Sequence, residues 1–289
     1  MKWIILVLSI FFSLDTIFAA QKETDEIHVQ EVYKTIDTLE LTIDIFYSKE
    51  TITDLNNTAI VFFHGGGWAF GTPDKLFSAC ERYAKMGIIC FCVDYRLSND
   101  KGTAPHNNIT PIESLMDVKS AIRWVRKNSD RFNINPEKIV ASGQSAGGHL
   151  AISTSIIEKY NESSDDFSIS CVPNAVMSFS GTVNTVEAWC DHLLGKRRTE
   201  IWNISPFHNL KGDLPPMIQF HGMQDATVPF WTIEFFKRET EALGNYFELH
   251  KYPGRKHYLG KGNPKYSEYF DDEILEIADE FLRNQGLIK

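Results

Sequence analysis

The sequence predicts an α/β fold built on a mostly parallel central sheet with helices on both faces. Short apolar runs rich in strand-forming residues alternate along the chain with longer segments whose apolar residues recur every three or four positions. Such alternation is typical of a parallel sheet covered by its connecting helices. The chain has 289 residues, of which 43% are hydrophobic and 23% charged, so one domain with a large core is expected.

The N-terminal residues have the pattern of a secretory signal peptide. A basic residue precedes the apolar stretch Ile4–Phe12, and the small residues Ala19 and Ala20 follow it. The stretch is too short for a transmembrane helix, although an uncleaved membrane anchor is the alternative. We therefore expect residues 1–20 to be removed after Ala19 or Ala20, residues 21–289 to form the folded domain, and the protein to be secreted or periplasmic.

Eight segments are expected to be strands, because they are short, apolar and rich in β-branched or aromatic residues. They are residues 27–33, 39–46, 59–63, 88–93, 138–142, 175–180, 217–221 and 246–252. The first two are expected to form an N-terminal antiparallel hairpin, and the others to supply the parallel part of the sheet.

Five segments are expected to be helices from their periodicity and their end signals. They are residues 73–86, 113–128, 148–158, 230–243 and 266–284. Thr72 is expected to cap the first helix, with Pro73 at its first position and Gly87 after its end. Between residues 181 and 215 only a short helix-like patch, Val186–Leu194, is expected.

Residues 143–147 read Gly-Gln-Ser-Ala-Gly and stand between an apolar strand pattern and a helical pattern. This is the Gly-x-Ser-x-Gly nucleophile elbow in its strand–turn–helix context. A serine hydroxyl is a poor nucleophile unless a tight turn exposes it to a base. The glycines avoid collisions, because side chains two positions on either side of the serine would clash at that turn. The motif therefore predicts Ser145 as a nucleophile.

The sequence His64-Gly65-Gly66-Gly67-Trp68 ends the apolar run before it. Acyl transfer passes through an oxyanion, which needs backbone N–H donors fixed in advance. A glycine-rich loop after this strand supplies some of these donors, and the residue after the nucleophile supplies another. We therefore predict an oxyanion hole formed by Gly65, Gly66 and Ala146, the alternative being a purely structural loop.

A serine nucleophile also needs a histidine that accepts its proton and a carboxylate that orients the histidine. In this arrangement the chain order is Ser, then Asp or Glu, then His. Asp225 follows the strand pattern at 217–221, and His257 follows the strand pattern at 246–252. Together with Ser145 they stand after strand ends, where open α/β sheets place their sites. These three residues are the candidate catalytic triad.

Other titratable residues compete for the same roles. His64 and His149 are expected to be structural, and His221 is the alternative base. Asp191, Asp271 and Asp272 are expected to be solvated.

Together these motifs resemble those of α/β-hydrolase-fold esterases of the hormone-sensitive-lipase-like group, and most of all compact bacterial carbohydrate-esterase-type members, the acetyl and feruloyl esterases. The matching segments are 64–68, 94–98, 143–149, 221–229 and His257, and the similarity runs from about residue 30 to the end. The segment 99–110 is longer and more polar than is usual in the group.

The resemblance implies a secreted serine esterase that needs no cofactor and acts on short-acyl or polysaccharide-linked esters. It also implies that Asp94 and Arg96 form a structural pair that braces the oxyanion loop, with Asp117 as another partner for Arg96. A serine exopeptidase or formamidase with the same triad is one alternative. A non-catalytic binding protein on the same fold is the other.

Little chain is available for a cap, so the site is expected to be open. Its walls would then come from aromatic side chains and the polar segment 99–110. The expected wall residues are Trp68, Phe70, Trp189 and Trp202, with Trp68 as the substrate-binding residue. Aromatic rings can stack on sugars, which favours a glycan ester, although these rings would also fit a sheet edge.

Composition excludes some functions and leaves others open. The net charge of −9 argues against nucleic-acid partners and stable association with anionic membranes. No metal-binding spacing is present among the five cysteines, and no metal is expected. Cys90, Cys92 and Cys171 lie in apolar patterns and are expected to be small core residues.

Overall fold

The computed structural model describes residues 26–51, 56–98, 109–187, 189–260 and 269–289. The predicted signal peptide and most of the predicted wall segment 99–110 lie outside these ranges. None of the described helices is both long enough and apolar enough to cross a membrane.

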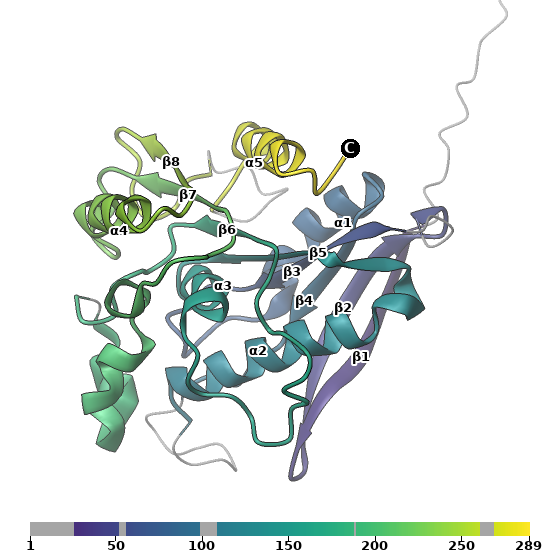
Figure 1. Ribbon diagram of the computed structural model, residues 1–289, viewed down its shortest axis with the longest axis horizontal. Coiled ribbons are helices and arrows are strands. Elements are labelled where there is room, and N and C mark those ends of the chain that lie inside the picture. Colours follow the sequence, from purple (N-terminus) through teal and green to yellow (C-terminus); the bar gives the residue numbers. More distant parts are fainter. Residues whose placement is uncertain (1–25, 52–55, 99–108, 188, 261–268) are drawn as a thin grey trace, which may run out of the picture.

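An eight-stranded sheet forms the centre of the molecule, in the order β1-β2-β4-β3-β5-β6-β7-β8 (Figure 1). Its strands are β1 (Glu26–Ile36), β2 (Leu39–Ser48), β3 (Asn57–Phe63), β4 (Ile89–Val93), β5 (Ile134–Gln144), β6 (Ala175–Phe179), β7 (Met217–Gly222) and β8 (Phe247–Tyr252). The hairpin of β1 and β2 is antiparallel, β2 pairs antiparallel with β4, and all other pairs are parallel. The predicted mostly parallel sheet with an N-terminal hairpin is confirmed.

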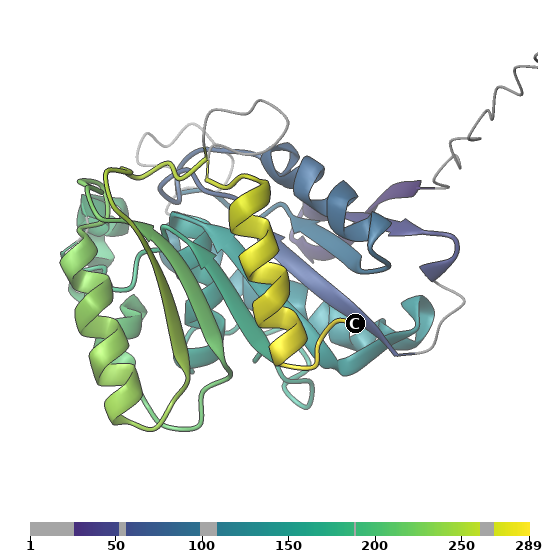
Figure 2. The same cartoon turned by 90° about the horizontal axis from the view of Figure 1, so that it is seen from above.

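Helices cover both faces of this sheet, as predicted (Figure 2). The α-helices are α1 (Phe77–Lys85), α2 (Pro111–Lys127), α3 (Ala146–Ile156), α4 (Phe230–Ala242) and α5 (Asp272–Asn284). Buried residues of α2, α3 and α4 pack on one face, whereas those of α1 and α5 pack on the other.

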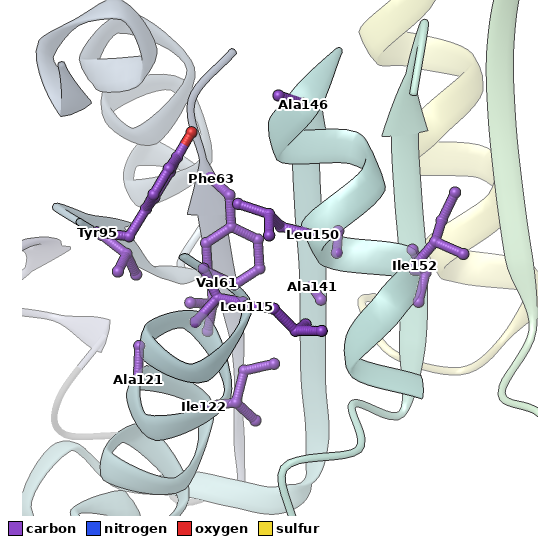
Figure 3. Close-up of a cluster of buried hydrophobic side chains, with 14 of the residues drawn as sticks. Val61, Phe63, Tyr95, Leu115, Ala121, Ile122, Ala141, Ala146, Leu150 and Ile152 are labelled. Carbon is purple, nitrogen blue, oxygen red and sulfur yellow. The ribbon is translucent and has the colours of Figure 1, made fainter. Parts of the chain in front are cut away.

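The middle strands are buried on both faces, so their side chains alternate between the two cores. On β3, Val61 and Phe63 contact the core beneath α2 and α3, as Figure 3 shows. Their neighbours Ile60 and Phe62 belong to the core beneath α1 and α5. This is why the strand reads as a continuous apolar run rather than as an alternation.

The five cysteines all lie in the described ranges, where they are buried and free. Cys90 and Cys92 are core residues of β4, as predicted, and both face the core beneath α1 and α5. The expectation for Cys171 holds as well, since its side chain is buried.

Two helix starts differ from the expectation because a side chain caps the helix. Helix α2 begins at Pro111, where Thr110 and Glu113 form a reciprocal capping box. Helix α5 begins at Asp272, because the Asp271 carboxylate accepts a hydrogen bond from the N–H of Ile274. Asp271 is therefore a buried cap, and its predicted solvation is wrong.

The expected cap at Thr72 is also wrong in detail. Pro73 begins a 3₁₀-helix, η2 (Pro73–Leu76), rather than an α-helix, and α1 follows it. The Thr72 hydroxyl donates to the carboxylate of Asp74 and makes no capping bond. Gly87 does follow the end of α1, with the positive φ of +80° that favours glycine.

The segment between β6 and β7 is more structured than predicted. It carries two 3₁₀-helical stretches, η4 (Trp189–Ile204), which is kinked at Gly195, and η5 (Pro206–Asn209). Ile201 and Ile204 of η4 are buried in the core that contains α2 and α3. The prediction of only a short patch was wrong because these tertiary contacts, not local periodicity, stabilise the segment.

Candidate active site

The turn after β5 holds Ser145 in a backbone conformation that few side chains adopt. Its φ is 52° and its ψ is −118°. Glycine is required on both sides, since a Cβ at Gly143 would lie 2.3 Å from the backbone of Gly147. A Cβ at Gly147 would lie 2.1 Å from the carbonyl oxygen of Phe63. The geometry of this elbow therefore requires both glycines, as predicted.

Three side chains from distant parts of the chain meet at this turn. His257 Nε2 lies 2.9 Å from Ser145 Oγ, and His257 Nδ1 lies 2.7 Å from Asp225 Oδ2. All three residues are buried. Ser145 follows β5, Asp225 follows β7, and His257 follows β8, so the parallel strands deliver them to one edge of the sheet.

The carboxylate of Asp225 accepts hydrogen bonds at both oxygens. Its Oδ1 accepts from the backbone N–H groups of Thr227 and Val228, at 2.8 and 2.9 Å. Its Oδ2 contacts two imidazoles, His257 at 2.7 Å and His221 at 3.2 Å. Burial acts to raise the pKa of Asp225, but the hydrogen bonds from His221 and His257 outweigh it and lower that pKa well below its usual range. The group is therefore a fixed negative charge beside His257.

The glycine-rich loop after β3 lies directly against the serine. A Cβ placed on Gly65 would lie 3.4 Å from the Cβ of Ser145. Gly66 has a φ of +126°, and a Cβ there would lie 2.0 Å from the carbonyl oxygen of Phe70. The structure thus brings Gly65 close to Ser145, and Ala146 follows Ser145 as the first residue of α3.

The segment after β4 braces this loop. The Tyr95 hydroxyl donates to the carbonyl oxygen of His64 at 2.7 Å, and the two rings stack with their centroids 4.4 Å apart. The N–H of Ser98 donates to the carbonyl oxygen of Trp68 at 2.6 Å. The loop is therefore held at both of its ends by one neighbouring segment.

Arg96 takes part in this brace through a different partner from the first one expected. Its Nε and Nη2 atoms bind the two oxygens of Asp117 at 2.8 and 2.7 Å, and its backbone N–H binds Asp117 as well. Lys34 is a second cation at the same carboxylate, with its Nζ 2.7 Å from Asp117 Oδ1. The predicted pair of Asp94 and Arg96 is wrong, and the alternative partner, Asp117, is the one observed.

The indole of Trp68 lies in the core rather than at the substrate. Its side chain is only 2% exposed, and its Nε1–H donates to His149 Nδ1 at 3.1 Å. The prediction that Trp68 binds substrate is therefore wrong, because the ring packs into the core that contains α2 and α3. The backbone of Trp68 has a positive φ of 58°. Trp68 instead connects the glycine-rich loop after β3 to α3.

His149 continues this connection, as its predicted structural role requires. Its Nε2 donates to the carbonyl oxygen of Ile204 at 2.7 Å, so the imidazole connects the glycine-rich loop after β3, α3 and η4. Burial lowers the pKa of His149 to about 4, against a smaller opposing effect of the Ile204 carbonyl. The ring is therefore neutral in the folded protein near neutral pH.

This buried histidine makes the fold sensitive to acid. The unfolded chain binds a proton at His149 below about pH 6.5, whereas the folded chain does so only near pH 4. Stability should therefore fall as the pH drops through this window, by about 3 kcal/mol at its acid end. His149→Gln keeps one donor and one acceptor without titrating. Denaturant unfolding at pH 7 and 4.5 should show a flatter pH dependence for this variant; parallel dependences would contradict the assignment.

The other predicted residues occupy varied places. His64 is buried, and its Nδ1 lies 2.8 Å from the carbonyl oxygen of Gly65, in keeping with a structural role. His221, the alternative base, contacts Asp225 and the carbonyl oxygen of Val228. The hydrogen bond at Ser145 Oγ is made by His257, so His221 is not positioned to act on the serine.

Two of the expected aromatic walls are available at the surface. Phe70, which follows the glycine-rich loop after β3, is 72% exposed, and Trp202 of η4 is 52% exposed. The side chain of Trp189 lies outside the described part of the structure. Two tyrosines beside His257 were missed: Tyr258 and Tyr269 have ring centroids 5.6 and 5.4 Å from its imidazole. Only the adjacency of Tyr258 to His257 was visible in the sequence.

This arrangement is equipped for acyl transfer through a serine nucleophile. A hydroxyl lies within hydrogen-bonding distance of an imidazole, the imidazole is oriented by a carboxylate, and a glycine-rich backbone lies beside the hydroxyl. Within the described ranges, no group of three His, Cys, Asp or Glu side chains could hold a metal ion.

The chain is similar to known esterases in sequence and in structure. The BD-FAE family model matches residues 43–239. The structure is similar to the apo form of esterase 2 from Thermogutta terrifontis, with a TM-score of 0.80 and 36% sequence identity over 91% of this chain and 96% of that one. The same esterase is also known phosphorylated by paraoxon, with propionate bound and with butyrate bound, at 35–36% identity.

Several curated proteins with similar sequences are also esterases. Esterase LipC from Mycobacterium tuberculosis is 27% identical over 221 residues, covering 68% of this chain and 52% of LipC. An acetylxylan esterase from Xylanibacter ruminicola is 30% identical over 230 residues, covering 76% of this chain and 44% of that protein. The chain thus spans about half the length of the curated relatives that it matches.

Proposed function

The chain belongs to the BD-FAE family of hormone-sensitive-lipase-like α/β hydrolases, and on this premise we propose that it is a serine esterase that hydrolyses carboxylic esters. The observation that carries the proposal is the continuous hydrogen-bonded path from Ser145 through His257 to Asp225. The similar proteins named above are esterases, which supports the same reaction type here.

In the proposed mechanism, Ser145 Oγ attacks the ester carbonyl carbon while His257 Nε2 takes its proton. The resulting oxyanion is bound by the N–H groups of Gly65, Gly66 and Ala146. His257 then gives its proton to the leaving alcohol, and the acyl group remains on Ser145. Asp225 orients the imidazole and stabilises its cationic form. Water, activated by His257, attacks the acyl-enzyme and releases the acid.

The proposal can be tested with an ester and a covalent inhibitor. We expect the protein to hydrolyse p-nitrophenyl acetate, and we expect paraoxon to inhibit it by adding one diethylphosphoryl group to the peptide that contains Ser145. The paraoxon-modified esterase 2 supports the choice of inhibitor. Tandem mass spectrometry locates the modified residue, and modification elsewhere would contradict the assignment.

The alternatives make different predictions for the same assay. A serine exopeptidase or formamidase would cleave an aminoacyl-nitroanilide or a formamide in preference to the ester. A non-catalytic binding protein would turn over neither substrate and would not consume paraoxon. The complete hydrogen-bonded triad argues against this last alternative, since binding proteins on catalytic folds usually lack a triad residue.

We propose that the substrate carries a short acyl group or is attached to a polysaccharide. The exposed rings of Phe70 and Trp202 support a surface that contacts a bulky, polar alcohol. The acetylxylan esterase among the relatives and the propionate and butyrate complexes of esterase 2 support short acyl groups.

A series of esters should reveal this preference. Each buried CH₂ contributes about 0.8 kcal/mol, so an enzyme with a deep apolar channel favours long acyl chains. Without such a channel, kcat/KM should be highest for acetyl to butyryl esters, fall for octanoyl and palmitoyl esters, and be substantial for acetylated xylo-oligosaccharides. A steady rise to palmitoyl with interfacial activation would instead indicate a lipase.

We also propose that the protein is exported and that its first 20 residues form a cleaved signal peptide. The apolar stretch Ile4–Phe12 and the small residues Ala19 and Ala20 support this proposal. Expression of the whole chain in a secreting bacterial host should yield a mature protein that begins at Ala20 or Gln21 by N-terminal sequencing. An intact N-terminus in the membrane fraction would indicate an anchor.

A further inference from the structure

Behind the carboxylate of Asp225 lies a pair of polar side chains that the proposed mechanism does not use. Gln219 and His221 project from β7, and both are fully buried. Gln219 Nε2 lies 2.9 Å from the carbonyl oxygen of Gly181 and 3.1 Å from His221 Nδ1. His221 Nε2 lies 2.9 Å from the carbonyl oxygen of Val228 and 3.2 Å from Asp225 Oδ2.

These contacts determine where the protons are. A carbonyl oxygen and a carboxylate can only accept, so His221 Nε2 must carry a proton. Gln219 must present its NH₂ group to the carbonyl oxygen of Gly181, because a rotated amide would place two acceptors against each other. The second N–H of that amide then points at His221 Nδ1, which must accept it. The imidazole is therefore neutral, with its single proton on Nε2.

This orientation of Gln219 leaves its side-chain carbonyl oxygen without a hydrogen bond in the described part of the chain. Its Oε1 is buried and has no hydrogen-bond partner among the described residues. An unsatisfied buried carbonyl is unfavourable, so the two hydrogen bonds of the NH₂ group must outweigh this cost. That group makes two contacts, and one of them prevents His221 Nδ1 from taking a proton.

We propose that Gln219 and His221 form a positioning pair that holds the acid loop and reserves the charge of Asp225 for His257. This inference deepens the proposed function and rests on it. His221 donates at once to Asp225 and to Val228, which lie at the two ends of the loop 225–228. Neither Gln219 nor His221 contacts the serine or a reacting atom, so neither acts as a catalytic residue.

The neutrality of His221 matters because Asp225 serves two imidazoles. A cationic His221 would form an ion pair with Asp225 and weaken the stabilisation of the cation that forms on His257 during reaction. Among the described residues, the titratable groups in contact with Asp225 are His221 from β7 and His257 from the loop after β8. From α4, the uncharged ring of Phe230 faces His221, with centroids 6.0 Å apart.

The first test compares two substitutions at His221. His221→Gln keeps a neutral N–H donor near the position of Nε2, whereas His221→Leu removes it. With p-nitrophenyl acetate, we expect His221→Leu to lower kcat about 10- to 100-fold with little change in KM, since a hydrogen bond to a charged group is lost. His221→Gln should stay within about threefold of the parent protein by the same reasoning.

The pH profile separates positioning from a merely structural role. In His221→Leu, Asp225 no longer receives a hydrogen bond from residue 221. Its carboxylate should then stabilise the protonated form of His257 more strongly, so the acid limb of the kcat/KM profile should move to higher pH. A structural defect alone would lower kcat/KM at every pH without moving the limb. His250→Leu, which removes another histidine that contacts a carboxylate, Glu248, is the matched control and should leave the limb in place.

The second test does not depend on activity. Heteronuclear NMR of the imidazole nitrogens at pH 7, with the His221 signals assigned by their loss in His221→Gln, should show one protonated and one unprotonated nitrogen. In Gln219→Leu the hydrogen bond to His221 Nδ1 is lost, so the signal of that nitrogen should shift. A doubly protonated His221 in the parent protein at pH 7, or His221→Leu with unchanged kcat and pH profile, would overturn the inference. An NMR result as expected in a protein without esterase activity would overturn only the proposed function.

Discussion

Replacing Ser145 by alanine is expected to abolish ester hydrolysis and to leave the fold intact. The hydroxyl that contacts His257 is the proposed acyl-enzyme nucleophile, so kcat should fall by about 10³- to 10⁶-fold, as in other serine hydrolases. The change removes one oxygen that hydrogen-bonds His257, so the free energy of unfolding should change by no more than about 1 kcal/mol.

The measurement is hydrolysis of p-nitrophenyl acetate alongside denaturant unfolding of the same preparation. Ser168→Ala is a suitable control, since Ser168 is exposed and its hydroxyl donates to the nearby Asp166. This control should behave as the parent protein in both assays. Turnover above a few per cent in Ser145→Ala, in a preparation free of host esterase, would remove Ser145 from the mechanism.

Replacing Asp225 by asparagine is expected to have the second largest effect, because the hydrogen bonds around it determine how the new amide must turn. The N–H groups of Thr227 and Val228 require an acceptor, so the asparagine oxygen should stay at the position of Oδ1. Its NH₂ group then faces His257 Nδ1 and His221 Nε2, where the native carboxylate oxygen accepts from both.

A donor facing His257 Nδ1 favours the wrong tautomer. The proton of the imidazole moves to Nε2, which can then no longer accept the proton of Ser145. In serine proteases the same substitution lowers kcat about 10⁴-fold, and we take this as the upper guide here. The ratio of kcat between Asp225→Asn and Asp166→Asn, an exposed carboxylate, measures the effect. Near-normal turnover in Asp225→Asn would mean that another group orients His257.

The sequence alone determined the local parts of this site. Each pattern that predicted the site depends on neighbours within a few residues. These patterns are the glycines two residues on either side of Ser145, the run of glycines after an apolar strand, and the carboxylate and the histidine that follow later strands. Parallel strands deliver their carboxyl ends to one edge of the sheet, so the order of strands along the chain was sufficient to predict that Ser145, Asp225 and His257 meet. The same local logic predicted the strands and the central helices.

The tertiary structure alone decided the partners of groups that face inward. Trp68 could have lined the substrate or packed inside, and the position of His149, 81 residues later, settled the matter. Arg96 could pair with the nearby Asp94, yet its guanidinium binds Asp117 of α2. In each case local periodicity gives the element but not the rotation of its side chains against a neighbouring element.

The same limit applies to the acid loop and to the segment between β6 and β7. The loop sequence places His221 four residues before Asp225, but only the fold shows that Gln219, held by Gly181, fixes the proton of His221. The helical turns of η4 depend on burial of Ile201 and Ile204 beneath distant helices, which no local pattern records. Short-range geometry and strand order are thus written in the sequence, whereas hydrogen-bond partners far apart in the chain arise only when the elements pack.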